Sequence, residues 1–288
     1  MARKRATLTD LLNELTFRVL YNKYKLLACS KFGYEGLPEG MKERNIENLL
    51  FHHGRCAYFK AEDEGLSFMC LEVCDDGKYN YMGEPLGYIA TGRGFTKHLK
   101  PEECVIIENN MFHMNTEDFV MFYVNKMSEA ERTMDVNVKA CKTPYIIACD
   151  DKDVLTFKRI FQQIDGNTPA IFADKGLNLN AIEVLKTDAK FLCNEIDDYI
   201  KSVECKLMTL LGFNNTAVDK KERVNVAETN SNNEIIEVFA QLQREAREKA
   251  LKEIKEKFGH EIKLVERTLE EVMNNVDDNT LRNNETDN

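Results

Sequence analysis

Apolar residues recur at helical spacing in several stretches of the chain. They predict helices over residues 9–27, 115–140 and 187–211 and a short helix over 41–50, and a strongly charged helix is predicted over 234–258. The 187–211 stretch has the clearest apolar stripe, with Thr187 placed to cap its first turn and Gly212 where a helix-ending glycine belongs. Asn115 and Asp118 form a capping pair before the 115–140 stretch.

Between residues 56 and 109 the pattern changes to short apolar runs separated by turns. The runs lie at residues 56–59, 66–73, 86–90 and 104–108, and they predict a small antiparallel meander. A compact mixed unit follows, with strands at 145–148, 170–173 and 181–185 and a helix at 155–164. Residues 261–265 alternate like an edge strand. We therefore expect an α+β fold with long helices.

Two polar stretches show no apolar period. Residues 214–233 are rich in asparagine and predict a mobile loop. The tail, residues 276–288, is rich in asparagine and aspartate and predicts disorder.

Composition and charge exclude several classes of protein. Hydrophobic residues make up 43% and charged residues 31% of the 288 residues, which is typical of a globular chain. The net charge of −10 means that the average surface repels nucleic acid, so any such contact needs a local basic patch. Apolar runs such as residues 119–124 fall far short of the roughly 20 residues that span a bilayer, and the start resembles no signal peptide. Nine cysteines without a secreted-scaffold spacing predict reduced thiols in a cytosol.

The motifs of catalysis are mostly missing. There is no phosphate-binding P-loop sequence, and Thr91–Gly94 predicts a β-turn. A zinc site from Cys70, Cys74, His52 and His53 would lack a Cys-x2-Cys pair.

Two acidic pairs, Asp150–Asp151 and Asp197–Asp198, could ligate magnesium, but they also fit a turn and a solvated helix face. A magnesium-dependent nucleic-acid enzyme and a small helical adaptor protein therefore remain the alternative functions.

Three basic features remain. The first is a terminal arm with Arg3, Lys4 and Arg5, which could contact nucleic acid or an acidic partner, or simply aid solubility. The second lies in the predicted loop and consists of Lys220, Lys221 and Arg223, which nearby acids offset. The third is Lys186, at the junction between a strand and the long helix that follows.

Five runs of residues occur in an order that identifies a family. They are Lys142–Pro144, Asp165–Ala173, Ile182–Ala189, Leu210–Gly212 and Lys220–Arg223. Together they closely resemble the portal protein, also called the upper collar or head–tail connector, of small podoviruses with protein-primed genomes (the Salasmaviridae type). The likeness extends more loosely to residues 1–5, 109–111 and 247–259, and it is poor over the rest of the first hundred residues.

The resemblance implies a closed homo-oligomeric ring, generally of twelve copies, at the head–tail vertex of the virion. Double-stranded DNA passes through such a ring during packaging and ejection, and the ring docks a separate packaging ATPase, the major capsid and scaffold proteins and the lower collar or tail protein. It implies no enzymatic activity, no cofactor and no metal, no membrane contact, and a host cytoplasm as the place of assembly. The regions that it implies are a wing (1–114), stem helices (115–141 and 187–212), a clip (142–186), a mobile channel loop (213–233), a C-terminal wing helix and strand (234–275) and a disordered tail (276–288).

The resemblance also implies which residues meet DNA. Lys186 matches a lysine of the family's channel, whereas Glu195 stands where the family has a second lysine, which Lys190 or Lys201 could replace. Asp198 belongs to the same channel-facing set. The helix carries five acids and three bases between residues 188 and 212, so we expect an acidic channel wall on average.

Two basic segments match family regions that contact nucleic acid. Lys220, Lys221 and Arg223 match a loop near the inner end of the channel that touches passing phosphates. Arg3, Lys4 and Arg5 match a terminus that in some relatives binds a packaging RNA and takes part in capsid assembly.

Overall fold

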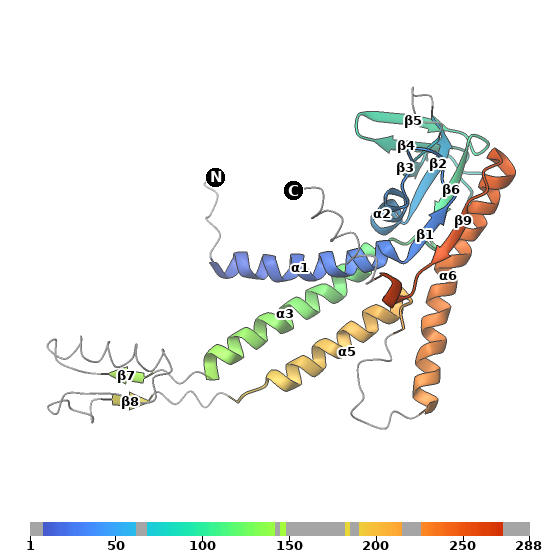
Figure 1. The fold of residues 1–288 in the computed structure, drawn as a ribbon. Helices are drawn as coiled ribbons and strands as arrows, with labels where there is room; N and C mark the ends of the chain where they lie inside the picture. The colour runs from blue at the N-terminus through green and yellow to red at the C-terminus, as the bar shows by residue number, and fades with distance from the viewer. Residues whose placement is uncertain are drawn as a thin grey trace, which may run out of the picture. The chain divides into compact units, whose positions relative to one another are not determined.

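The computed structural model describes residues 8–61, 68–141, 145–147, 182–184, 190–214 and 226–272. Its contacts divide the chain into two units, Met1–Glu129 with Tyr199–Asn288, and Ala130–Asp198. In chain order the elements are α1 (Leu8–Ser30), β1 (Phe32–Glu35), α2 (Glu43–His53), β2 (Arg55–Lys60), β3 (Phe68–Asp75), β4 (Tyr88–Gly92), β5 (Phe95–Leu99), β6 (Cys104–Glu108), α3 (Glu117–Cys141), β7 (Tyr145–Ile147), β8 (Ile182–Val184), α5 (Cys193–Leu211), α6 (Val226–Phe258) and β9 (Lys263–Glu266) (Figure 1).

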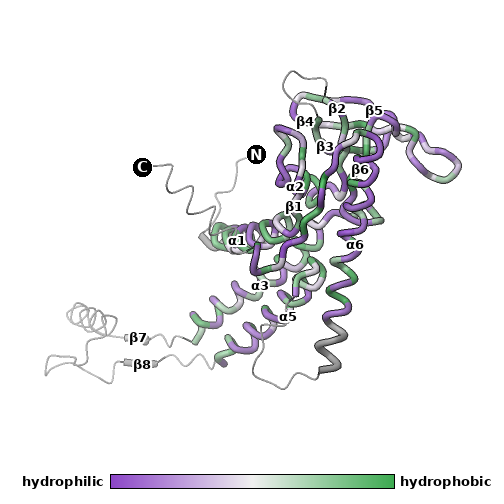
Figure 2. The backbone as a smooth tube through the Cα atoms, turned by 45° about the vertical axis from the view of Figure 1, so that its right-hand side comes forward, coloured by the Kyte–Doolittle hydropathy of each residue, from purple (hydrophilic) through white to green (hydrophobic). Residues whose placement is uncertain are grey.

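The predicted meander is confirmed and is part of a five-stranded antiparallel sheet in the first unit. Its strand order is β5-β4-β3-β2-β6, so the last strand returns to pair with the first. Strand β5 was not predicted; it pairs with β4 across a tight turn in which Gly94 has a positive φ of 69°. The interior strand β2, between β3 and β6, is buried on both faces, because Tyr58 packs into one apolar cluster and Phe59 into another. Figure 2 shows the hydrophobic stretches that run along this sheet.

A second, two-stranded sheet joins the two ends of the first unit. The predicted edge strand near residue 263 is confirmed as β9, and it pairs antiparallel with β1, which the sequence pattern did not indicate. Phe32 of β1 is buried although the strand is only four residues long. This pairing brings the C-terminal part of the chain back to the end of α1.

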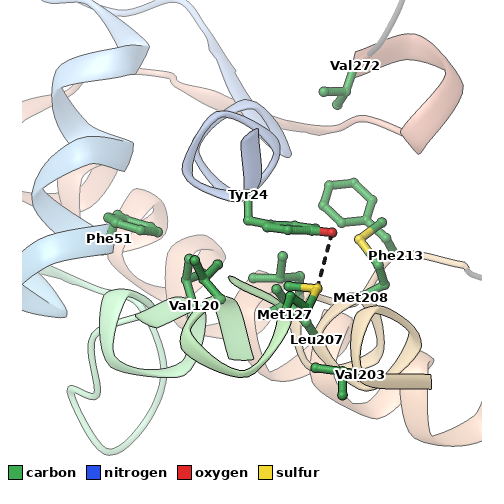
Figure 3. Packing of buried hydrophobic residues seen from close by; sticks show 11 residues of the cluster. Tyr24, Phe51, Val120, Met127, Val203, Leu207, Met208, Phe213 and Val272 are labelled. Atoms are coloured by element: carbon green, nitrogen blue, oxygen red, sulfur yellow. Dashed lines mark hydrogen bonds between the residues drawn. The ribbon is translucent and has the colours of Figure 1, made fainter. Parts of the chain in front are cut away.

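The helical core of the first unit forms where α1, α2, α3 and α5 meet. Tyr24 of α1 lies at its centre and is 1% exposed, with Val120 and Met127 of α3 and Leu207 of α5 around it (Figure 3). The Tyr24 hydroxyl donates a hydrogen bond to Glu204 Oε1 (2.7 Å) and lies 3.7 Å from the Met127 sulfur. A buried tyrosine is thus stabilised both by its ring contacts and by a partner for its hydroxyl.

A polar network also connects α1, α2 and α3. Tyr21 of α1 donates to the Glu117 carboxylate, whose second oxygen lies 2.7 Å from His52 Nδ1 of α2. Lys25 Nζ lies 2.7 Å from the other nitrogen of the same histidine. Burial alone would raise the pKa of Glu117, but these hydrogen bonds outweigh it and lower that pKa.

A buried ion pair links α6 to α2. Arg247 and Glu47 are 2% and 3% exposed, and the guanidinium contacts the carboxylate through Nε–Oε1 (2.9 Å) and Nη2–Oε2 (2.8 Å). The three remaining N–H groups donate to the Asn109 backbone oxygen, the Asn109 side-chain oxygen and the Gln243 backbone oxygen. All five guanidinium donors are therefore satisfied. Burial by itself would lower the pKa of Arg247. The attraction and the hydrogen bonds of the nearby Glu47 carboxylate outweigh burial, so the pKa of Arg247 is raised.

A second buried cation holds the end of α5. Lys31 is 2% exposed, and its ammonium donates to the backbone oxygen of Leu211 (2.9 Å) and to Gln243 Oε1 (3.2 Å). A cation at a helix C-terminus satisfies an unpaired carbonyl and interacts favourably with the helix dipole. Burial lowers the pKa of Lys31 to about 8. Gly212, which follows Leu211 at the end of α5, has a positive φ of 72°. A Cβ at this position would lie 2.5 Å from the Lys31 nitrogen, which is too close, so a glycine is required here.

Helix boundaries follow the predicted capping residues at some ends only. Asn115 accepts a hydrogen bond from the Asp118 amide (3.1 Å), which confirms the capping pair before α3. Helix α6 begins at Val226 rather than at residue 234, so the predicted loop is wrong over 226–233. Its asparagines lower helix propensity only modestly, and extending an existing helix adds one hydrogen bond per residue.

The second unit contains the end of α3, β7, β8 and the start of α5. Strands β7 and β8 confirm two predicted strands, and they pair antiparallel with Tyr145 opposite Val184. The predicted helix at 155–164 and strand at 170–173 lie outside the described residues, as does the tail at 276–288.

The ion pair between α6 and α2 generates a stability prediction. Replacing Arg247 by Met leaves the Glu47 carboxylate buried without its partner, so the free energy of unfolding should fall by about 3–5 kcal/mol. The control is Lys252→Ala on the same helix, which removes an exposed contact with Glu256 and should change stability by less than about 0.5 kcal/mol. Guanidinium unfolding followed by circular dichroism, at equal protein concentrations, measures both.

The double variant Arg247→Met/Glu47→Met distinguishes lost packing from an uncompensated charge. It should recover much of the stability that Arg247→Met loses, because no unpaired charge is left. A loss below about 1 kcal/mol in Arg247→Met would show that the pair does not hold α6 in place.

Candidate nucleic-acid interface

Helix α5 carries the candidate channel residues on the side opposite its buried stripe. Val203 and Leu207 lie in the helical core, and their spacing places them on one face. Glu195 and Asp198 are exposed, and Lys201 is half-buried. The described part of α5 therefore has an apolar face that packs inside the subunit and a charged face open to solvent.

The charge of that open face is more balanced than the sequence indicated. Glu204, which the sequence count included, is bound by Lys23 Nζ (2.9 Å) and by the Tyr24 hydroxyl (2.7 Å) of α1. Burial alone would raise the pKa of Glu204, but these two hydrogen bonds outweigh it and lower that pKa, so the carboxylate is ionised within an intrasubunit contact. Asp188 lies outside the described residues. Without Glu204, four acids and three bases remain between residues 188 and 212: Asp188, Glu195, Asp197, Asp198, Lys190, Lys201 and Lys206.

Asn137 of α3 fixes the segment that carries Lys190. Its side-chain nitrogen donates to the Lys190 backbone oxygen (2.8 Å), and its side-chain oxygen accepts from the Leu192 amide (2.9 Å). The side-chain amide thus pairs with the backbone much as a neighbouring strand would. The Lys190 side chain is exposed while its backbone is held.

The same contact explains why α5 begins later than predicted. The sequence placed the helix start at Thr187, but residues 190–192 are not helical and the first turn begins at Cys193. The Leu192 amide is bound by Asn137, and the Leu192 carbonyl accepts the amide of Ile196 (3.0 Å), as an N-cap residue does. The sequence gives no local signal for Asn137, because its partners lie more than 50 residues away along the chain.

The other candidate residues lie outside the described residues. They are Lys186, Lys220, Lys221, Arg223, Arg3, Lys4 and Arg5. The structure therefore assigns contacts to none of the loop and arm residues, and their roles stay predictions.

The side chains considered for zinc do not converge on one point. His52 contacts Glu117 and Lys25, and Cys70 has its sulfur 2.9 Å from that of Cys56. His53 lies beside Glu72 (3.3 Å). Among the described residues, no group of three or more histidine, cysteine, aspartate or glutamate side chains could hold a metal ion. The helices in the described ranges include none with the length and apolar character that crossing a membrane requires.

Three solved structures align with most of this chain. A chain from the portal and tail of native bacteriophage P68 is 16% identical and aligns with a TM-score of 0.50 over 99% of both chains. An HK97 family phage portal protein from Corynebacterium diphtheriae is 13% identical, with a TM-score of 0.41 over 92% of this chain and 96% of that one. A chain from the virion of a native gene transfer agent particle is 10% identical, with a TM-score of 0.47 over 94% and 84%. The likeness to the P68 chain shows that the two chains share a mixed helix-and-sheet fold.

A family model resolves the identity further. The model of the Phage Connector (GP10) family matches residues 3–270, so the chain belongs to that family. It is a phage connector, or portal, protein, as the sequence resemblance predicted.

The contact between Asn137 and the segment before α5 generates a local prediction. Asn137→Ala removes the acceptor of the Leu192 amide, so this amide should exchange with solvent about three- to tenfold faster, as the loss of one hydrogen bond implies. Amides in the buried half of α5 should keep their protection. Native-state hydrogen exchange measures both, with Asn125→Ala, an exposed asparagine on the same helix, as the control. Unchanged exchange at Leu192 would mean that Asn137 does not hold this segment.

Proposed function

We propose that this connector works as a closed ring of identical subunits, generally of twelve copies, at the head–tail vertex of the capsid. Double-stranded DNA would enter through the ring during packaging and leave through it during ejection. The observation that carries the proposal is the family match over residues 3–270. A ring follows when one surface of a subunit contacts a different surface of the next through a rotation that closes.

The exposed apolar side chains support an assembly of this kind. Val19 of α1, Phe122 of α3 and Val238 of α6 are each at least half exposed. Single exposed apolar residues are ordinary, but groups of them on several helices mark surfaces that other chains cover. In a ring, neighbouring subunits supply that cover.

In this proposal the long helices form the wall of the channel. Residues 115–141 and 187–212 are the stem, residues 142–186 the clip, and residues 1–114 with 234–275 the wing. The charged face of α5, with Glu195 and Asp198, faces the bore while the opposite face packs inside the subunit.

A nearly balanced wall suits a duplex that has to move. Each lysine that neutralises a phosphate releases counterions, and the free energy gained must be given back when the DNA advances. Acidic side chains between the basic ones keep the average potential from holding the DNA at one position. Between residues 188 and 212, the four acids other than Glu204 and the three bases come close to this balance.

A few basic groups then contact the passing phosphates. Lys186 forms one ring of charges, and Lys190, held by Asn137, forms a second that takes the place of the family lysine missing at Glu195. The segment with Lys220, Lys221 and Arg223 contacts DNA near the inner end of the channel.

The ring itself is not an enzyme in this proposal. A separate packaging ATPase supplies the work and docks on the connector, as do the capsid, the scaffold and the lower collar or tail protein. The terminal arm with Arg3, Lys4 and Arg5 contacts an acidic partner there, such as a packaging RNA or the capsid.

Assembly state is the first test of this function. Purified protein should form particles of about 400 kDa, as twelve copies of a 33.2-kDa chain require, with a central hole in electron micrographs. Mass photometry over a range of concentrations measures the size. A chain that stays monomeric at micromolar concentrations would contradict the proposal.

The channel lysine is tested by the salt dependence of DNA transit. Lys186→Glu should slow packaging much more at low salt than at high salt, because the screening length falls from about 10 Å at 0.1 M to about 3 Å at 1 M. Lys252→Glu on α6 reverses a charge at a highly exposed site and should leave the rate unchanged. An equal slowing by Lys186→Glu at both salt concentrations would point to a structural defect.

A further inference from the structure

Two cysteines face each other across the pair of strands β2 and β3. Cys56 lies on β2 and Cys70 on β3, and their sulfurs are 2.9 Å apart. Cys56 stands opposite Glu72 and Cys70 opposite Tyr58, so the two cysteines are diagonal neighbours on one face of the sheet. Within the described residues, each of these sulfurs has the other as its hydrogen-bond partner. The fold therefore brings together a pair of thiols.

The two thiols differ in their access to solvent. Cys56 is 0% exposed and belongs to the buried apolar cluster that contains Ile46, Leu50 and Tyr58. Cys70 is half-buried and packs against the same cluster from its border. A cysteine side chain behaves as a small apolar group, so its burial here costs little in either the thiol or the disulfide form. A small molecule in solution can reach Cys70 first.

The sulfurs need to move little to form a bond. A disulfide has an S–S length of about 2.0 Å, so the separation of 2.9 Å has to shrink by about 0.9 Å. In a regular antiparallel ladder, diagonal neighbours have Cα atoms about 7–8 Å apart, which is near the upper limit that a disulfide spans. The two side chains must therefore point toward each other, and the short distance between their sulfurs shows that they do.

We propose that Cys56 and Cys70 are a redox-active pair that closes into a disulfide within the subunit when its surroundings become oxidising. A phage particle leaves the reducing interior of its host, and disulfides form and persist in the surroundings that it then meets, on virion surfaces among other places. The inference goes beyond the proposed function. It does not depend on ring assembly, because both cysteines belong to one subunit.

With a small disulfide as the oxidant, the reaction consists of two thiol–disulfide exchanges. The Cys70 thiolate attacks one sulfur of the oxidant, so a mixed disulfide forms and a first small thiolate leaves. The Cys56 sulfur then attacks the Cys70 sulfur as a thiolate, and the second small thiolate leaves. The two leaving thiolates take up the two protons that the cysteines lose. Two cysteine thiols are thus oxidised to one disulfide, while the oxidant is reduced to two thiols.

The second exchange should be the slower one. Burial raises the pKa of the Cys56 thiol well above its usual range, so only a small fraction of this sulfur is thiolate at neutral pH. Its closeness to Cys70 favours the exchange, because the attacking sulfur is already held beside its target. A mixed disulfide on Cys70 should therefore appear first and then give way to the internal bond.

Trapping the thiols after oxidation tests the pair. The purified full-length chain is incubated with oxidised glutathione, quenched in acid, alkylated with N-ethylmaleimide under denaturing conditions, digested and analysed by mass spectrometry. Seven of the nine cysteines should be alkylated, and one peptide pair should be linked through Cys56 and Cys70. The linked chain should migrate as a single subunit on a denaturing gel without reductant. Alkylation of both cysteines, or glutathione that stays on Cys70, would overturn the proposal.

Cys74→Ser is the matched control on the same strand. Trypsin cleaves after Lys60 and Lys78, so the peptide that carries Cys70 also carries Cys74, and the variant identifies which of the two sulfurs is linked. Cys74 is exposed and stands opposite Ile89, away from Cys56, so Cys74→Ser should form the link to the same extent as the wild type. Loss of the link in Cys74→Ser would assign the bond to the wrong sulfur and overturn the proposal.

Thermal unfolding gives a second readout of the same bond. Oxidised wild type should unfold about 5 °C above the reduced protein, because the bond restricts the unfolded chain, and dithiothreitol should reverse this shift. Cys70→Ser should fold as the wild type does, by circular dichroism, and show no shift on oxidation. Cys70→Ala replaces it should the serine variant unfold. An equal shift in the wild type and in the Cys70 variant would assign the effect to other thiols and overturn the proposal.

Discussion

The buried pair between Arg247 and Glu47 is the interaction on which the rest of the first unit depends. It joins residues 200 positions apart along the chain, and every guanidinium N–H has an acceptor. A buried ion pair stabilises a fold only when its groups are satisfied in this way, because desolvation otherwise outweighs the attraction. Arg247 thus fixes α6 against α2 and the end of β6. Lys31 acts similarly on the end of α5, so buried cations position both helices.

The sequence predicted those parts of the fold that have local signals. Apolar periodicity was enough for α3, the strands of the meander and β9, and Asn115 marked the start of α3. It was not enough for β1, a four-residue strand containing glycine, because its partner β9 lies more than 220 residues away. Arg247 did carry a signal, since it stands in phase with the buried Ala240, Leu251 and Ile254 of α6, and a charge in an apolar stripe indicates a buried pair. Its partner Glu47 could not be read from the same pattern.

For the candidate channel face, the structure gives the exposure and the intrasubunit contacts of its residues, and its place at a channel stays a prediction. Glu195 and Asp198 are exposed, as amphipathicity indicated, but Glu204 is engaged by Lys23 and Tyr24. A count of charges along a helix cannot distinguish a carboxylate that faces solvent from one bound by another helix. The consequence for the proposed channel is a wall that is less acidic than the sequence count indicates. Such a wall allows DNA to slide because no position binds much more strongly than the next.

The central claim is that subunits of this connector close into a ring with the charged face of α5 toward a shared channel. A cryo-electron microscopy reconstruction of the purified wild-type assembly tests it most directly. The account predicts a closed ring in which Glu195 and Asp198 line a bore wide enough for a DNA duplex. A reconstruction in which these acidic residues point away from the symmetry axis, or in which copies pair about a twofold axis without closing a ring, would contradict it.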